Sequence, residues 1–275
     1  MTKSVYRFGA DAAEGSRRMK ALLGGKGANL AEMAAAKLPI PPVFTITTEV
    51  CAAAMARDGD PPDEVWAEVL EAIRWLEQVT GKRFGDPERP LLLSVRSGAA
   101  ISMPGMMDTV LNLGQTAETA RQIALDPARA RFAWDCLRRF VHMFSSVVVG
   151  IPHEAFERAL SAHKSRTGKV MDSELDAADL EAISLEFLKI HEQHRKAPFP
   201  TDAEEQLRLS VRAVFRSFNG ERAVKYRQVQ RITDLVGTAV NVQAMVFGNL
   251  GARSGTGVCL TGNPATGGTG LSCTY

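Results

Sequence analysis

The spacing of hydrophobic residues divides the chain into three stretches, and the first of them mixes two periods. Residues 44–48 are rich in β-branched side chains and residues 91–95 form a short apolar run, so both are predicted to be strands. Between them, residues 63–80 repeat apolar side chains at helical spacing until Gly81, which is typical of a helix stop. Strands and helices in this order, over residues 1–115, favour an α/β or α+β layered fold.

The second stretch has the helical period throughout. Helices are predicted near residues 116–125, 128–149, 152–166 and 176–196. Asp176 is a suitable N-cap for the last of these, and a further helix is predicted after Pro200. We interpret this stretch as a helical insertion rather than as a catalytic core.

The third stretch begins at Gly237 and returns to a strand pattern. Residues 238–247 predict a strand, residues 248–251 a glycine-rich turn, and residues 255–260 a second strand. Together they predict a β-hairpin. Residues 267–272 are small and are predicted to be structureless.

The composition indicates a soluble globular protein but does not indicate a particular function. The chain has 275 residues, of which 45% are hydrophobic and 23% charged, as in an ordinary soluble globular protein. Lys and Arg number 33 against 31 Asp and Glu, so the net charge of +2 predicts neither a nucleic-acid nor a membrane partner. No apolar run approaches the roughly 20 residues of a membrane span, and no secretory signal is visible. The four cysteines form no C-x-x-C pair, which fits a reducing, cytoplasmic location.

The first motif with possible chemistry is the glycine-rich run at residues 22–33. Three glycines surround Lys26 directly before a helical pattern, so free backbone N–H groups and a helix N-terminus would lie beside one positive charge. This arrangement predicts an anion site, although the sequence is not a P-loop. The alternative is a glycine turn that carries a solvated lysine.

The second motif is a buried strand that ends at Arg96, where a loop of small residues begins. Strand ends followed by small residues are where α/β enzymes place ligands, and an arginine fork suits phosphate oxygens. The turn at residues 104–108, Pro-Gly-Met-Met-Asp, is unusually apolar and predicts a lid over a ligand. The alternative is a structural arginine paired with a carboxylate.

Other polar residues carry weaker predictions. Gln243, on an apolar strand, is suited either to the edge of an adenine or to a satisfied position in the core. His191 and His194 stand three residues apart on a helix, but no third ligand has a suitable spacing, so we expect solvated surface rather than a metal site. Arg138 and Arg139 are predicted to lie on a polar helix face.

Taken together, four runs of sequence resemble the amino-terminal part of the pyruvate, phosphate dikinase family. They are residues 22–33, 39–48, 91–114 and 237–248, and the most specific portions are 94–99 and 102–109. The resemblance implies an α+β, ATP-grasp-like nucleotide-binding domain that is incomplete at its C-terminus. The implied subdomains are residues 1–115, a helical insertion at 116–199, and residues 200–275 as return helices and first strands of the second subdomain.

The same resemblance implies an activity. Family members convert ATP, phosphate and pyruvate to AMP, pyrophosphate and phosphoenolpyruvate, with magnesium and a monovalent cation. The phosphoryl group passes through a phosphohistidine on one separate domain to pyruvate on another, and the full-length protein is expected to be a homo-oligomer. Two alternatives stay open: a relative such as phosphoenolpyruvate synthase, and a non-catalytic nucleotide-binding remnant.

The resemblance also implies roles for individual residues. Arg96 would be the catalytic arginine that steadies the transferring phosphoryl groups, and Lys26 would lie near the nucleotide phosphates. Gly98, Gly105 and Met107 would belong to the loop that closes over the polyphosphate. The residues along the adenine edge would be Gln243, Met245 and Val246.

The chain departs from the family pattern near its end. Residues 261–264 read Thr-Gly-Asn-Pro, without the arginine that the family has there, and residues 268–275 lack the expected acidic and aromatic continuation. We expect the magnesium ligands to lie beyond this chain, and no residue is assigned to a metal here. We therefore expect the isolated chain to be inactive, to bind ATP weakly and to expose apolar strand edges.

Overall fold

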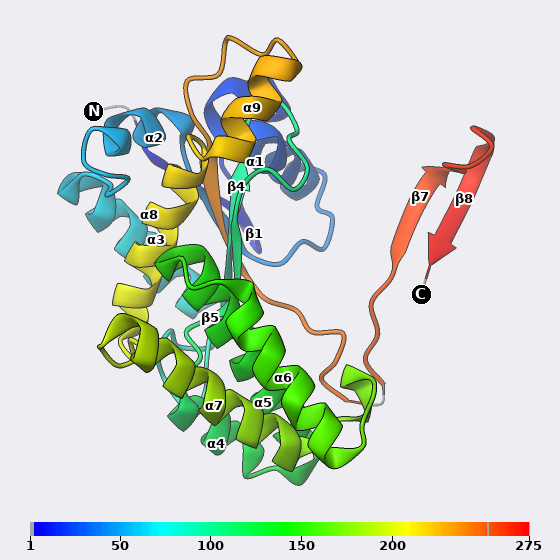
Figure 1. Ribbon diagram of the computed structural model, residues 1–275. Coiled ribbons are helices and arrows are strands. Elements are labelled where there is room, and N and C mark those ends of the chain that lie inside the picture. The colour runs from blue at the N-terminus through cyan, green and yellow to red at the C-terminus, as the bar shows by residue number, and fades with distance from the viewer. Residues whose placement is uncertain (1–2, 252, 275) are drawn as a thin grey trace.

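A six-stranded antiparallel sheet organises the first and last thirds of the protein (Figure 1). The computed structural model describes residues 3–251 and 253–274. The strand order is β2-β1-β3-β6-β4-β5. The strands are β1 (Val5–Gly9), β2 (Ala12–Ala13), β3 (Val43–Ile46), β4 (Leu93–Gly98), β5 (Thr109–Leu113) and β6 (Ala239–Ala244). All neighbouring pairs are antiparallel, which together with the separate helices confirms the α+β class.

Both faces of this sheet are covered, because successive side chains of a strand point to opposite sides. Val43 of β3 packs with α1 (Lys20–Ala35) in a small core, whereas Phe44 and Ile46 belong to the main core. The other helices of this part are α2 (Thr48–Met55), α3 (Asp63–Thr80), α8 (Ala203–Ser217) and α9 (Glu221–Val229).

The helix α3 has the bounds that its sequence predicts. Its apolar stripe is buried, and Gly81 follows with a left-handed φ of 65°, donating its N–H to Glu77 O. Glycine takes this conformation without a Cβ penalty, which explains why the helix stops there.

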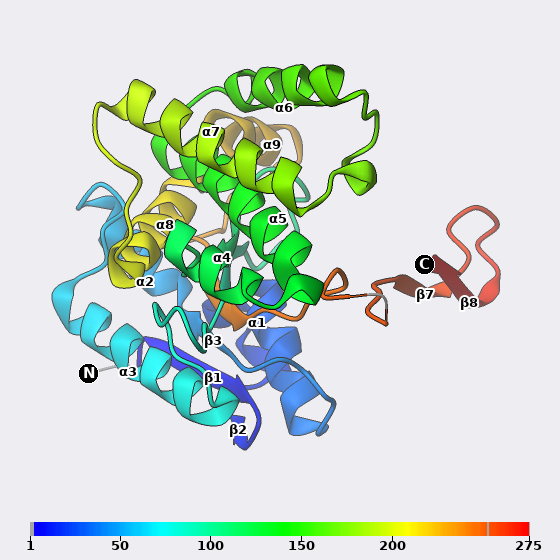
Figure 2. The ribbon, with the colours of Figure 1, turned by 90° about the horizontal axis from the view of Figure 1, so that it is seen from below.

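The helices α4 (Ala117–Ala124), α5 (Pro127–Phe144), α6 (His153–Thr167) and α7 (Ala177–Arg195) form the middle part of the protein (Figure 2). The predicted helical segments are confirmed, and Asp176 caps α7 by accepting a hydrogen bond from the Asp179 N–H at 3.0 Å. The segment expected to continue α5 instead becomes a π-helical turn, η2 (Ser145–Val149), ended by Gly150. No helix within the described residues is at once long and apolar enough to cross a membrane.

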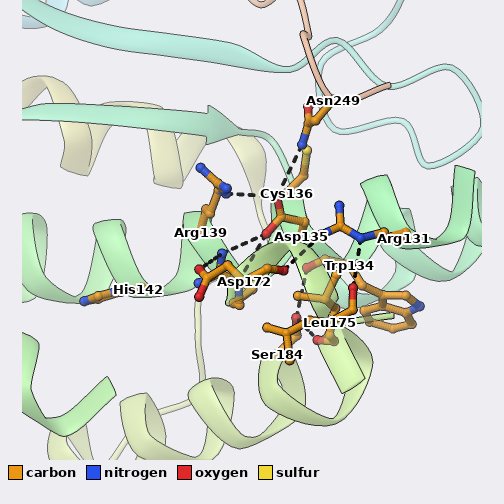
Figure 3. A network of polar contacts seen from close by, with 12 residues as sticks. Arg131, Trp134, Asp135, Cys136, Arg139, His142, Asp172, Leu175, Ser184 and Asn249 are labelled. Atoms are coloured by element: carbon orange, nitrogen blue, oxygen red, sulfur yellow. Dashed lines mark hydrogen bonds and ion pairs between the residues drawn. The ribbon is translucent and has the colours of Figure 1, made fainter. Parts of the chain in front are cut away.

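A buried ion-pair network holds the helical part together (Figure 3). The carboxylate of Asp135 accepts hydrogen bonds from Arg138 at 2.8 Å, Arg139 at 2.9 Å and Asn249 at 3.2 Å. Arg138 also pairs with Asp172 at 3.3 Å. The prediction that Arg138 and Arg139 share a polar face is wrong for Arg138, which is buried, because Asp135 one turn earlier neutralises its charge.

The predicted hairpin between residues 238–247 and 255–260 is wrong. β6 lies inside the main sheet, where it pairs with β3 and β4. The strand β7 (Val258–Gly262) pairs instead with β8 (Thr269–Thr274), which corrects the expectation that residues 267–272 are structureless. Both views show this hairpin away from the main body (Figures 1 and 2). Sequence patterning shows that a segment is extended, but long-range packing selects its partner.

The β7–β8 hairpin also joins two of the cysteines. Cys259 and Cys273 stand directly opposite each other in the register, with Cα atoms 4.1 Å apart, and form a disulfide. Cys51 and Cys136 are free and buried. The expectation of thiols in a reducing environment missed this pair because the pairing depends on strand register, which cysteine spacing does not encode.

Candidate functional site

The best-defined site lies where β4 ends, and it has the form of a cavity of about 350 Å³. Its lining residues come from the first part of α1, the end of β4, the start of β5 and the loop between these strands: Lys20, Gly25, Lys26, Asn29, Arg96, Ser97, Ala99, Ala100, Ile101, Ser102, Met103, Pro104, Gly105, Met107 and Thr109. Arg96 stands opposite Asn241 on β6 and Thr109 on β5. The structure thus brings the first two sequence motifs together.

Close backbone contact between α1 and β4 builds the wall of this cavity. α1 is broken at Gly24, which has φ 68° and ψ 173°, a conformation essentially restricted to glycine. A Cβ atom at Gly24 would lie 1.5 Å from the carbonyl oxygen of Gly98. The helix resumes at Gly25, whose N–H donates to Ala99 O at 2.9 Å. The break therefore turns a new helix N-terminus toward the cavity.

Lys26 and Arg96 make the cavity positive. The Lys26 ammonium donates a hydrogen bond to Ser97 O at 2.8 Å. Its pKa lies below the usual lysine range, first because of burial and second because of the nearby charge of Arg96. Arg96 is exposed between the buried Val95 and Ser97, and it forms no ion pair with any described residue. This geometry does not support the alternative of a structural arginine held by a carboxylate.

Polar residues that the sequence interpretation missed hold β4 in place. Thr45 donates to the Asn241 side-chain oxygen at 2.7 Å, and the Asn241 amide reaches Arg96 O at 3.5 Å. Thr238 accepts the Gly98 N–H at 3.1 Å. A Cβ at Gly98 would meet Asn241 Nδ2 at 2.6 Å, so this contact also requires glycine. In the sequence, Thr45 and Asn241 are both polar residues between apolar neighbours, a pattern typical of a solvent-facing strand side, so no local feature indicates their burial.

The loop between β4 and β5 is packed against the protein at some residues and open at others. Met103 is buried, and Met107 is half-buried against the main core. Gly105 has a left-handed φ of 71° and open space around it. At the end of the loop, the Asp108 N–H donates to Ser217 Oγ at 3.3 Å, and burial raises the pKa of the Asp108 carboxyl. The anchored methionines fix the two sides of the loop while its glycine tip is unconstrained.

The third motif does not line this cavity. β6 runs antiparallel to β4, so residues beyond Asn241 lead away from Arg96. Gln243 donates to Pro41 O at 3.2 Å, and the Met245 N–H donates to Leu92 O at 3.0 Å. Val246 is exposed. The adenine role of Gln243, Met245 and Val246 stays a prediction.

His191 and His194 lie apart from the cavity. The expected solvated surface is wrong for His191, whose ring is buried and bonded to Ser145 Oγ at 2.7 Å, with Phe199 edge-on at 5.0 Å. Burial, helped by the charge of Arg195, lowers the pKa of His191 to about 4. His194 is exposed.

An antiparallel sheet flanked by helices, with a helix N-terminus, Lys26 and Arg96 around one cavity, defines an α+β protein with a positively charged pocket. Residues 20–60 and 58–273 match the family described as "Pyruvate phosphate dikinase, AMP/ATP-binding domain". The chain belongs to this family.

Curated relatives agree with this assignment. The chain is 51% identical over 265 residues to pyruvate, phosphate dikinase 1, chloroplastic, of Oryza sativa subsp. japonica, covering 96% of the chain and 28% of the relative. It is 51% identical over 266 residues to pyruvate, phosphate dikinase 2 of Zea mays, covering 97% of the chain and 30% of the relative. The Flaveria pringlei enzyme is 50% identical, with 96% and 28% covered. The chain thus spans less than a third of the length of these relatives.

Proposed function

We propose that this chain is the ATP-binding part of a pyruvate, phosphate dikinase and that its cavity receives the nucleotide phosphates. The observation that carries the proposal is the juxtaposition of Lys26 and Arg96 on one cavity, with no ion-pair partner for Arg96 among the described residues. Two uncompensated cations beside a helix N-terminus attract a polyphosphate. The match to an AMP/ATP-binding family supports the same ligand.

Each element of the cavity has a proposed role. The planar fork of Arg96 can hold two phosphate oxygens as charge develops during transfer. Lys26 contributes a second charge, lying 2.8 Å from Ser97 O, at the start of the resumed helix. The loop with Gly98, Gly105 and Met107 would close over the phosphates and exclude water. Exclusion of water strengthens both electrostatic contacts.

The wider assembly belongs to the proposal as well. We assign an ATP-grasp arrangement with the helical insertion at residues 116–199, and an adenine edge along Gln243, Met245 and Val246. Because these three residues lie beyond Asn241, an adenine held by them would extend along β6, away from Arg96.

The complete reaction, from ATP, phosphate and pyruvate to AMP, pyrophosphate and phosphoenolpyruvate, is proposed for the longer protein, with its phosphohistidine and pyruvate-binding domains. Magnesium is part of that proposal, but the described residues contain no group of three or more His, Cys, Asp or Glu side chains that could hold a metal ion. No residue of this chain is assigned to magnesium, and no step is routed through it.

The proposal is tested by titrating the chain with ATP. NMR follows the titration, so that weak binding is measurable. Lys26→Gln and Arg96→Gln should each weaken binding by roughly tenfold or more, since hydrogen bonds to charged groups contribute about 1.5–3 kcal/mol. Arg121→Gln is the control, because this arginine is exposed on α4 and lies outside the cavity. ATP binding that survives both cavity substitutions unchanged would remove the nucleotide phosphates from this cavity.

A further inference from the structure

A second positively charged cavity lies between α8 and the C-terminal end of α7, on elements different from those of the first. It has a volume of about 280 Å³. Its lining residues are Val148, Val149, Arg195, Leu209, Arg212, Ala213 and Arg216. They come from the π-helical turn η2, the C-terminal end of α7 and the middle of α8. Three arginines therefore line one small cavity whose other lining residues are apolar.

The positive charge of this cavity is only partly neutralised. Arg212 and Arg216 both pair with the carboxylate of Asp58, in the second case at 3.6 Å. Arg195 forms no ion pair with a described residue, and no acidic side chain lines the cavity. Three arginines against one aspartate leave two positive charges in excess. This is the charge that a phosphate monoester dianion would neutralise.

The backbone holds these arginines in place before any ligand arrives. Asp58 has a left-handed φ of 55° and Gly59 one of 84°. A Cβ at Gly59 would lie 2.7 Å from Arg216 Cγ and 2.8 Å from Arg212 O, so the loop lies directly on α8. The close approach positions the Asp58 carboxylate between two guanidinium groups. A site whose side chains are already oriented loses less entropy on binding.

The apolar side of the cavity rests on an unusual element. π-helical turns are rare and occur frequently at functional sites. Here η2 supplies Val148 and Val149, and its first residue, Ser145, bonds to the buried His191 at 2.7 Å. His191 lies one helical turn before Arg195 on α7. The η2 turn thus fixes the position of Val148 and Val149, the apolar floor of the cavity, relative to Arg195.

We propose that this cavity binds a small organic phosphate monoester. The phosphate lies among Arg195, Arg212 and Arg216, and the carbon skeleton lies against Val148, Val149 and Leu209. A phosphate monoester offers three terminal oxygens and up to two negative charges to several arginine forks, whereas a single carboxylate offers two oxygens and one charge. The inference does not depend on nucleotide binding, because the two cavities have no lining residue in common.

Arginine modification with phenylglyoxal, mapped by mass spectrometry, tests the site residue by residue. Butyl phosphate, inorganic phosphate and malonate serve as probes. We expect butyl phosphate to protect Arg195, Arg212 and Arg216 but not Arg158, an exposed arginine of α6 outside both cavities. Protection should need several-fold less butyl phosphate than inorganic phosphate, because its carbon chain covers the apolar floor. Malonate, a dicarboxylate of similar charge, should protect less than either phosphate.

Calorimetry on variants provides the second measurement. Arg195→Gln with Arg216→Gln should weaken butyl phosphate binding at least roughly tenfold, whereas Arg158→Gln should leave it unchanged. Protection of Arg158 equal to that of Arg195, or unaltered binding by the double variant, would overturn the proposal. Protection by malonate as strong as by butyl phosphate would overturn the choice of a phosphate. Loss of ATP binding by Lys26→Gln is a separate outcome, since it reports on the first cavity alone.

Discussion

Two regions of this protein use charged residues in opposite ways. Around Asp135 in the helical part, each charge has a partner: the carboxylate is buried and bonded to Arg138, Arg139 and Asn249. Around the cavity at the end of β4, Lys26 and Arg96 are neighbours of the same sign, and burial together with Arg96 lowers the Lys26 pKa. The first arrangement stabilises the fold, whereas the second leaves two like charges without an ion-pair partner among the described residues.

The difference has a physical cause. A buried charge without a partner is costly, so the helical part can bury Asp135 only by surrounding it with donors. The cavity avoids that cost by leaving both Arg96 and Lys26 exposed, with the Lys26 ammonium bonded to a backbone oxygen. Substitutions should therefore change stability in one region and binding in the other.

The largest expected effect is a loss of stability when the ion pairs around Asp135 are broken. Asp135→Ala should lower the free energy of unfolding by about 3–5 kcal/mol, because it leaves the buried Arg138 without its main partner. Chemical denaturation measures the loss. Asp172→Ala is the matched control: this carboxylate also pairs with Arg138 but is 45% exposed, so its loss should cost at most about 1 kcal/mol. Equal losses would mean that burial does not set the strength of the network.

At the cavity, we expect stability to depend on the backbone contact at Gly24 rather than on the charges of Lys26 and Arg96. Gly24→Ala should cost at least about 2 kcal/mol and weaken ATP binding, because its Cβ would overlap Gly98 O at 1.5 Å. Gly81→Ala is the control, since Gly81 also has a positive φ, 65°, but no atom within 4 Å of a new Cβ. It should cost only about 1 kcal/mol and leave binding intact. Chemical denaturation and ATP titration of both variants distinguish the cost of a positive φ from the cost of a steric overlap with Gly98.

The smallest expected effect is a decline in ATP affinity at alkaline pH. The folded-state pKa of Lys26 is lowered, so its charge is lost as pH rises through a value below the ordinary 10.5. ATP affinity should therefore decline at alkaline pH before ordinary lysines titrate, by less than the loss in Lys26→Gln. Lys26→Arg should remove this decline because arginine stays protonated. The same alkaline decline in Lys26→Arg as in the wild type would show that another group titrates.

Local features of the fold were predictable from sequence. The stripe of residues 63–80 and the stop at Gly81 predicted α3 with its observed bounds, and Asp176 was identified as the cap of α7. These features depend on contacts a few residues apart, so periodicity and capping chemistry encode them. The two motifs at Lys26 and Arg96 were also recognisable, because glycine-rich turns next to cations are local patterns.

Long-range partners were not predictable in the same way. β6 was recognised as a strand but assigned to the wrong hairpin, and the burial of Arg138 and His191 was missed. In each case the outcome depends on residues distant in sequence or on how an entire helix packs. Asn241, for example, contacts Thr45, 196 positions away.

Sequence patterns were therefore sufficient to predict the type of most elements, the α+β class and the two charged motifs. The break of α1 at Gly24 against Gly98, which brings Lys26 and Arg96 onto one cavity, depends on tertiary packing. So does the position of Gln243, Met245 and Val246 outside that cavity. The reason is that propensity acts along the chain within a few residues. A binding cavity, in contrast, forms from segments whose proximity depends on sheet register and on close backbone packing.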